Sequence, residues 1–378
     1  MNNPSLDQLE TPALLLDEAR MQHNIDRMRS RLARFRVGFR PHVKTNKCIE
    51  VTRRLTADAA GPITVSTLHE ADYFTARGVT DILYAVGIAP NKLDHVTKLR
   101  RQGVKLSVIL DSAEAARMVA AHGRANGETF DVLIEIDTDR HRAGVPPEAP
   151  ELIAIGRELN GDGATLMGVM THAGKSYDCK SADEIRAMAE QERAGVVTAA
   201  LRLREAGLPC PVVSVGSTPT ALYAENLDGV TEVRAGVYVF FDLVMAGLGV
   251  CRTDEIALSV MATVIGQQVE KGWTIVDAGW MAMSRDRGTA RQAVDQGYGL
   301  VCDLRGRPLD GLIVIDANQE HGIVAARPGA APATPLPVGT QVRILPNHAC
   351  ATAAQFGEYQ VLAPGNVLRE TWQRLNGW

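Results

Sequence analysis

The sequence predicts an α/β protein in which a (β/α)8 TIM barrel precedes an all-β domain. Eight short runs rich in β-branched residues alternate with helical stretches over the first 250 residues, which is typical of a parallel barrel. After about residue 251, strands are separated by turns, with no long helix between them. A chain of 378 residues also exceeds one ordinary core. We therefore expect a barrel over residues 20–250 and a β domain over residues 251–378.

The barrel region opens with an apolar run at residues 14–17 and an amphipathic stripe over residues 17–35, which indicate a strand and then a helix. Eight barrel strands are predicted, at residues 37–43, 63–66, 82–86, 105–110, 132–137, 166–171, 211–215 and 233–240. Helices are predicted between them, notably at residues 68–77, 91–102, 112–126 and 182–206. Periodicity alone leaves a doubly wound open sheet as the alternative.

The C-terminal region is predicted to be an all-β domain, with turns and no long helix between its strands. They are expected at residues 256–265, 273–277, 300–304, 312–318 and 341–345. The segment 327–337 is rich in alanine and proline and is expected to be a loop.

Composition excludes several classes of protein. The net charge of −4 argues against a general nucleic-acid binder. No run of eighteen apolar residues indicates a membrane span, and the polar first ten residues do not form a secretory signal. Six scattered cysteines without a CxxC pair indicate reduced thiols in the cytoplasm.

Lys44 follows the first predicted barrel strand, in the segment Arg40-Pro41-His42-Val43-Lys44-Thr45. Barrel enzymes place their reactive groups at such strand ends. In a dry pocket a lysine loses its proton more readily, because desolvation disfavours the ammonium. The neutral amine can then form a Schiff base with an aldehyde cofactor. A solvated lysine beside a helix start is the simpler interpretation of this residue taken alone.

Later strand ends carry groups suited to an anionic cofactor. After the seventh strand, glycine backbone and hydroxyl groups precede a helix and can hold an anion, and barrels often bind phosphate there. Taken singly, these groups are also explained as a capped turn, a structural histidine or an ordinary N-cap. The candidates after strands five, six and seven are Arg142, His172, Tyr177, Gly216, Ser217 and Thr218.

The β region contains a histidine and a cysteine two positions apart, His348 and Cys350. In an extended segment this spacing puts the imidazole and the thiol on one face. Such a pair can bind a borderline-soft divalent ion and leave other positions for water or substrate. An isolated pair of this kind is also common by chance.

The segment from Arg40 to Thr45 resembles the lysine motif of fold-type III pyridoxal 5′-phosphate (PLP) enzymes, the alanine racemase-like barrels. The chain is most similar, over nearly its whole length, to the D-serine dehydratase and D-threonine aldolase family, and within it to the D-threo-3-hydroxyaspartate dehydratases. The resemblance implies that Lys44 holds PLP and that residues 1–19 pack with the β domain. It implies further cofactor contacts, with Arg142 near the phenolate oxygen, His172 and Tyr177 near the ring, Gly216, Ser217, Thr218 and Tyr238 near the phosphate, and Arg234 near the pyridine nitrogen.

The same resemblance implies that His348 and Cys350 bind a divalent metal, which would be Mn, Mg, Zn or Co. Gln319 and His321 match a family segment and are candidates to face the substrate. Arg285 lies in the loop 277–288, which resembles the D-threo-3-hydroxyaspartate dehydratases, and its guanidinium suits a second substrate carboxylate. Bracing of the loop or of a dimer contact is the alternative for this charge. The family implies a homodimer that acts on a small molecule.

The resemblance predicts a lyase that dehydrates a D-3-hydroxy amino acid, giving a 2-oxo acid and ammonia. D-threo-3-hydroxyaspartate is the expected substrate type, and D-serine and D-threonine are possible ones. A D-threonine or 3-hydroxy-D-aspartate aldolase, giving glycine and an aldehyde, is the nearest alternative. A non-catalytic PLP homeostasis protein and a racemase are further alternatives, although the long C-terminal region argues against the former.

Overall fold

The computed structural model describes residues 5–378, whose contacts divide the chain into two compact units. The first, which we call the β unit, contains the chain up to Arg27 together with Thr45–Glu50 and Val237–Gly377. The second, the barrel unit, contains Met28–Lys44 and Val51–Gly236, with Trp378. The sequence predicts a simpler division at residue 250, which remains a prediction. Residues 1–4, which were expected to pack with the β domain as part of residues 1–19, lie outside the described part of the chain.

The barrel unit is built on eight parallel strands. Their order is β2-β10-β9-β8-β6-β5-β4-β3, and β7 (Asn160–Gly161) pairs outside this path with β8. The bounds are β2 (Gly38–Phe39), β3 (Ile63–Val65), β4 (Asp81–Gly87), β5 (Lys105–Leu110), β6 (Phe130–Ile136), β8 (Ala164–Thr171), β9 (Val212–Val215) and β10 (Glu232–Val233).

A parallel bridge closes the ring of strands. Beyond β2 the chain stays extended, and His42 pairs with Thr64 of β3. The amide of Val43 donates to the carbonyl of Thr64, and the amide of Thr64 donates to the carbonyl of Pro41. The first and last strands of the list are therefore joined, and the predicted barrel, rather than an open sheet, is confirmed.

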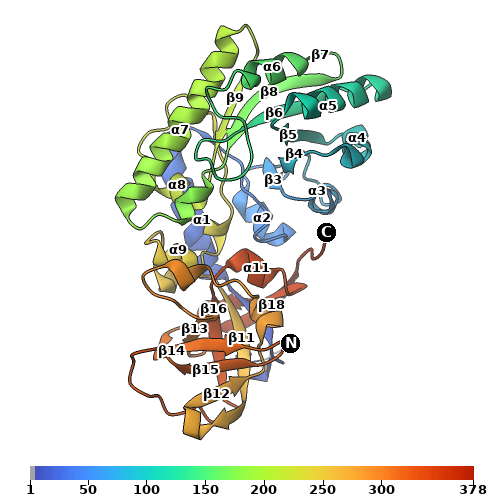
Figure 1. Ribbon diagram of the computed structural model, residues 1–378. Helices are drawn as coiled ribbons and strands as arrows, with labels where there is room; N and C mark the ends of the chain where they lie inside the picture. Colours follow the sequence, from blue (N-terminus) through green and yellow to red (C-terminus); the bar gives the residue numbers. More distant parts are fainter. Residues whose placement is uncertain (1–4) are drawn as a thin grey trace. The chain divides into compact units, whose positions relative to one another are not determined.

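Alternate residues of the strands fill the inside of this barrel. Leu83, Ile109, Leu133 and Met170 come from the neighbouring strands β4, β5, β6 and β8 and form one buried cluster. Figure 1 shows helices α5, α6 and α7 outside the strands. The helices are α2 (Ile49–Leu55), α3 (Leu68–Thr75), α4 (Leu93–Arg101), α5 (Ala113–Asn126), α6 (Glu151–Glu158), α7 (Ala182–Glu205) and α8 (Thr218–Tyr223).

The last predicted barrel strand is much shorter than expected. The prediction of a strand over residues 233–240 is wrong beyond Val233, because β10 ends there and a 3-10 turn, η4, follows at Val237–Val239. All three residues of that turn are buried. The apolar run thus reflects burial in a core and not a longer strand.

The β unit contains a closed ring of six strands. In the order β12-β15-β14-β13-β16-β11, each strand pairs antiparallel with the next, and β11 pairs back to β12. A register shift between Val264 and Gly266 lets the long strand β11 serve both partners. The bounds are β11 (Leu258–Gln268), β12 (Trp273–Val276), β13 (Gly299–Cys302), β14 (Pro308–Ala317), β15 (Gly322–Ala326) and β16 (Gln341–Pro346).

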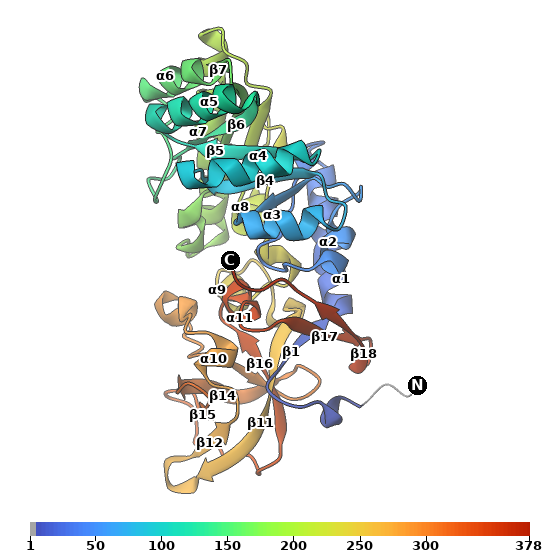
Figure 2. The same ribbon diagram turned by 90° about the vertical axis from the view of Figure 1, so that its right-hand side faces the viewer.

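Three more strands extend this sheet from β11. β1 (Ala13–Asp17) pairs antiparallel with β11 and parallel with β17 (Glu358–Ala363), which forms a hairpin with β18 (Val367–Gln373). Figure 2 shows this hairpin beside β1. The short helices α9 (Leu243–Gly247), α10 (Trp280–Met283) and α11 (Ala349–Ala353) belong to the same unit.

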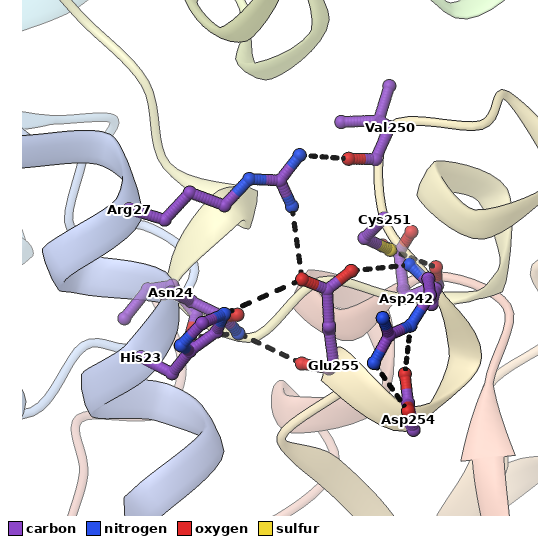
Figure 3. A network of polar contacts seen from close by, with 10 residues as sticks. His23, Asn24, Arg27, Asp242, Val250, Cys251, Asp254 and Glu255 are labelled. Atoms are coloured by element: carbon purple, nitrogen blue, oxygen red, sulfur yellow. Dashed lines mark hydrogen bonds and ion pairs between the residues drawn. The ribbon is translucent and has the colours of Figure 1, made fainter. Parts of the chain in front are cut away.

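The middle of helix α1 (Glu18–Ala33) is held to the segment 239–255 of the β unit by polar contacts (Figure 3). Asn24, which is fully buried, donates to the carbonyl oxygen of Glu255 at 3.0 Å. Arg27 donates to the carbonyl oxygen of Val250 at 2.8 Å and to the Glu255 carboxylate at 3.4 Å. These bonds anchor the middle of the helix. No helix in the described part of the chain has the length and apolar character needed to cross a membrane.

Candidate active site

Five strand ends of the barrel unit bring candidate residues to one edge. Lys44, Arg142, His172, Gly216 and Arg234 follow β2, β6, β8, β9 and β10 respectively. Because these strands are parallel, their carboxyl ends meet at the same rim. The positive charges of Lys44, Arg142 and Arg234 all act on His172, so the structure does bring these predicted residues together.

His172 is held in one tautomer and kept neutral. Its Nδ1 donates to the carbonyl oxygen of Gly216 at 2.7 Å, which leaves Nε2 without a proton. Burial, together with the charges of Lys44, Arg142 and Arg234, lowers the pKa of His172 to about 3. The ring of Tyr177 lies 6.3 Å from it between centroids. A neutral, oriented imidazole of this kind can pack on an aromatic cofactor without adding charge.

His42 is a second neutral imidazole at this rim, and sequence reasoning assigned it no role. Its Nδ1 accepts from the amide of Lys44 at 3.4 Å, and its Nε2 lies 3.4 Å from the Ser66 hydroxyl. Burial and the charges of Lys44 and Arg234 lower the pKa of His42 well below its usual value. The spacing of two residues from Lys44 along an extended segment was the signal that could have found it.

Lys44 itself does not lie in the dry pocket that we expected. Its side chain is exposed. The amine is therefore accessible to a small molecule. Arg142 is also exposed.

Arg234 is buried, and three carboxylates act on it electrostatically. Its Nε donates to the Ser214 hydroxyl at 2.9 Å, and its Nη2 donates to the carbonyl oxygen of Thr171. Burial lowers the pKa of Arg234, and the nearby carboxylates of Glu232, Glu192 and Glu135 oppose that shift. The guanidinium is thus fixed by neutral acceptors and balanced by charges at longer range.

Hydroxyl groups gather where the phosphate site was predicted. Ser217 caps α8, and its Oγ lies 2.9 Å from Ser176 Oγ and 2.9 Å from Thr220 Oγ1. All three residues are buried. Hydroxyl protons rotate to suit an acceptor, so this cluster fits an anion. Gly216 permits the close approach here, because a Cβ at this position would collide with the carbonyl oxygen of Arg234.

Tyr238, the remaining cofactor candidate, belongs to the β unit. It lies in η4 and is almost completely buried.

His348 and Cys350 are not on an extended segment, and that expectation is wrong. Strand β16 ends at Pro346, His348 is the N-cap of α11, and Cys350 lies inside this short helix. The two side chains nevertheless interact directly. Burial lowers the pKa of His348, but the sulfur of Cys350 and the carboxylates of Asp286 and Asp242 outweigh it and raise the pKa to about 11.

Two acidic residues that sequence reasoning did not single out support this pair. Asp286 Oδ2 lies 2.7 Å from His348 Nδ1, so Nε2 is the nitrogen that can bind an ion. Asp242 accepts from the amide of Ala349 at 3.0 Å and from the amide of Met245 at 3.0 Å. It thereby joins the first turns of α9 and α11, and burial raises its pKa.

Cys350 also contacts the segment that follows the predicted cofactor lysine. The hydroxyl of Thr45 lies 3.1 Å from Cys350 Sγ, and both residues belong to the β unit. Thr45 is the next residue after Lys44 in the chain. Within residues 5–378, no cluster of three or more His, Cys, Asp and Glu residues suited to a metal is present. An ion at His348 and Cys350 would take its other ligands from elsewhere.

The predicted substrate residues lie near α10. The guanidinium of Arg285 stacks on the Trp280 ring at 4.3 Å and is exposed, whereas Arg287 is paired with Asp295 at 2.9 Å. Gln319 and His321 are exposed in the turn between β14 and β15. The amide of Met281, in α10, donates to the carbonyl oxygen of Gln319 at 3.1 Å. Arg285 and this turn therefore share α10 as a support.

Two family models match the chain, one in each region of the sequence. Residues 16–244 match the alanine racemase N-terminal domain. Residues 257–362 match a serine dehydratase domain.

Two curated relatives align over most of the chain. D-threo-3-hydroxyaspartate dehydratase of Delftia sp. (strain HT23) is 60% identical over 98% of this chain and 98% of its own length. D-threonine aldolase of Arthrobacter sp. is 29% identical over 97% of this chain and 93% of its own.

Solved structures of D-threo-3-hydroxyaspartate dehydratase superpose closely on this chain. A cysteine-to-alanine mutant in the metal-free form has a TM-score of 0.96 and 58% identity, covering 99% of this chain and all of the other. A histidine-to-alanine mutant, altered two positions earlier in that enzyme, has a TM-score of 0.97 and 58% identity, covering 100% of this chain and 97% of the other.

Proposed function

Since this chain belongs to the family of alanine racemase-like proteins with a serine dehydratase domain, we propose that it is a PLP- and metal-dependent dehydratase of D-3-hydroxy amino acids. The substrate type is D-threo-3-hydroxyaspartate, and the products are a 2-oxo acid and ammonia. The observation that carries this proposal is the 60% identity to D-threo-3-hydroxyaspartate dehydratase over 98% of the chain.

The residues at the barrel rim fit PLP. Lys44 offers an accessible amine for the aldehyde, and the hydroxyl cluster around Ser217 suits the phosphate together with Gly216, Thr218 and Tyr238. His172 and Tyr177 would lie by the ring, Arg142 by its phenolate oxygen and Arg234 by its nitrogen. The burial of Arg234 and Ser217 supports a site formed before the cofactor binds.

The donors of the β unit fit a borderline-soft divalent metal. Cys350 supplies sulfur and His348 supplies Nε2, because Asp286 engages its other nitrogen. A thiolate donor favours Zn and disfavours Mg. In support, one structure of the dehydratase relative is a cysteine mutant in the metal-free form.

When bound, PLP would supply an electron sink for the substrate Cα, and a divalent metal held by His348 and Cys350 would supply a Lewis acid for the β-hydroxyl. The Lys44 amine would be the base that removes the proton from the substrate Cα. Arg285 binds the second carboxylate of a hydroxyaspartate, because its guanidinium is exposed and stacks on Trp280, whereas the guanidinium of Arg287 is already paired with Asp295. Gln319 and His321, carried by the neighbouring turn, complete the substrate contacts.

An aldolase on the same substrates is the second candidate, favoured by the match to D-threonine aldolase. To separate the two, purified protein is incubated with D-threo-3-hydroxyaspartate and with D-threonine. We expect ammonia and oxaloacetate from the former, and no products from the Lys44→Ala variant. Glycine and an aldehyde from either substrate would overturn the dehydratase assignment.

We extend the proposal to a homodimer in the cytoplasm. All six cysteines are free thiols in the structure, which suits a reducing compartment. Analytical ultracentrifugation of the holoprotein and cell fractionation test the two points. A monomeric holoprotein, or one recovered from the periplasm, would contradict them.

A further inference from the structure

Glu192 is a buried carboxylate in the middle of the 24-residue helix α7. It is 2% exposed, and it is not one of the residues predicted to touch cofactor, metal or substrate. Carboxylates are seldom fully buried unless they have specific partners. Its partners therefore indicate why this position is acidic.

Glu192 bonds to groups that follow β8 and β9 at the barrel rim. Its Oε1 accepts from the amide of Ala173 at 3.1 Å and from the amide of Gly216 at 3.0 Å. The side chain of Thr220 also bonds to it. Ala173 directly follows His172, and Gly216 directly precedes Ser217, so one carboxylate joins the ring-facing loop to the hydroxyl-bearing loop.

These bonds form a closed ring with His172. The imidazole of His172 donates from Nδ1 to the carbonyl oxygen of Gly216 at 2.7 Å. The amides of Ala173 and Gly216, one in each loop, donate to Glu192. Thr220, the third partner, completes the capping box with Ser217. Loss of the carboxylate would leave two buried N–H groups unpaired, which is unfavourable, and would free both loops at once.

We infer that Glu192 is a positioning residue, which fixes the His172 loop against the Ser217 loop and thereby preforms the phosphate end of the cofactor site. This inference rests on the proposed function, because it takes PLP as the ligand. It assigns Glu192 no contact with cofactor or substrate.

The test measures cofactor affinity rather than turnover. Apoprotein is titrated with PLP and with pyridoxal, which lacks the phosphate, and binding is followed by visible absorbance. For Glu192→Ala we expect the Kd for PLP to rise at least about tenfold, and the Kd for pyridoxal to rise clearly less, because pyridoxal has no phosphate to lose its contacts. Glu192→Gln keeps an oxygen acceptor for both amides and should bind PLP like the wild type. Glu190→Ala is the matched control, because Glu190 lies on the same helix, is exposed and pairs only locally with Arg193 at 2.5 Å.

Each outcome decides the matter. Equal weakening of PLP and pyridoxal would indicate a general loss of structure and overturn the inference, as would unchanged PLP affinity in Glu192→Ala. If that variant does not fold, Glu192→Asp replaces it, because the shorter side chain cannot reach both amides, and normal PLP affinity there would also refute the inference. A wild-type chain that binds no PLP would instead overturn the proposed function, and this inference with it.

Discussion

Asp286 sets which nitrogen of His348 is available. Its Oδ2 lies 2.7 Å from Nδ1, and the hydrogen bond from His348 lowers the pKa of Asp286. Carboxylates that orient metal-binding histidines typically contribute about 10- to 100-fold to metal affinity. We therefore expect Asp286→Asn to weaken Zn²⁺ or Mn²⁺ binding by about that factor, measured by calorimetric titration of the metal-free protein.

Asp295→Asn is the matched control for this loop. Asp295 pairs with Arg287 at 2.9 Å and is half-exposed, so its loss should leave metal affinity within about twofold, as for most surface charges. Equal metal binding by Asp286→Asn and wild type would show that Asp286 does not orient the ligand.

His172 makes stability depend on pH. Its pKa is about 3 in the folded protein and about 6.5 when unfolded, so between these values only the unfolded chain takes up the proton. The free energy of unfolding therefore has its full value above about pH 6.5 and falls as the pH is lowered towards 3. At pH 5 the loss is about 2 kcal/mol. In urea unfolding of the PLP-free protein, we expect the drop in stability from pH 7.5 to 5.0 to be smaller for His172→Gln by about this amount.

His42 shifts in the same direction as His172, so the double variant His42→Gln/His172→Gln should lose still less stability on acidification. A pH dependence identical in wild type and His172→Gln would mean that His172 titrates normally in the folded state.

Among the elements of the barrel rim, the turn between β9 and α8 requires glycine. A Cβ at Gly216 would collide with the carbonyl oxygen of Arg234, a backbone atom that cannot move without its strand. We expect Gly216→Ala to lower the free energy of unfolding by about 2–3 kcal/mol and to weaken PLP binding. Gly87→Ala, at the end of β4, is the control, because nothing lies within 4 Å of its Cβ position. Equal stability of the two variants in urea would contradict the packing argument.

Most elements were predictable because their pattern matched their burial. The strand predicted at residues 105–110 is β5 without change, and the stripe over 17–35 forms α1, with Met21, Ile25 and Met28 buried. β17 and β18 were missed. Of the two, β18 lies at the edge of the sheet, and only two of its residues are buried. There the apolar signal on which strand prediction depends is weak.

The predicted site residues were found by the rule that barrel strands end at the functional rim, and His172 and Gly216 do meet there. The groups that orient them were not predictable in the same way. Glu192 lies within a charged stretch of a long helix, and the sequence pattern there predicts an exposed side chain. Asp286 is 62 residues from His348, so only the folded chain shows their contact. The chemical roles of all these residues remain predictions.

At the scale of the whole molecule, the two kinds of candidate ligand belong to different units. The PLP candidates other than Tyr238 lie in the barrel unit, whereas His348, Cys350 and Asp286 lie in the β unit. Within their units, the His172 ring is fixed by Gly216 and Glu192 and the His348 ring by Asp286. Each set of contacts is complete without a residue of the other unit.

We therefore expect metal removal to leave the bound cofactor in place. After treatment with EDTA and dialysis, the protein should keep its visible PLP absorbance while ammonia release from D-threo-3-hydroxyaspartate falls to background, because the leaving hydroxide is no longer stabilised. Re-addition of Zn²⁺ or Mn²⁺ should restore the rate. Lys44→Ala supplies the converse case, in which the absorbance is lost while metal content is unchanged. Bleaching by EDTA would show that the two sites depend on each other, and an undiminished rate would remove the metal, and with it His348 and Cys350, from the reaction.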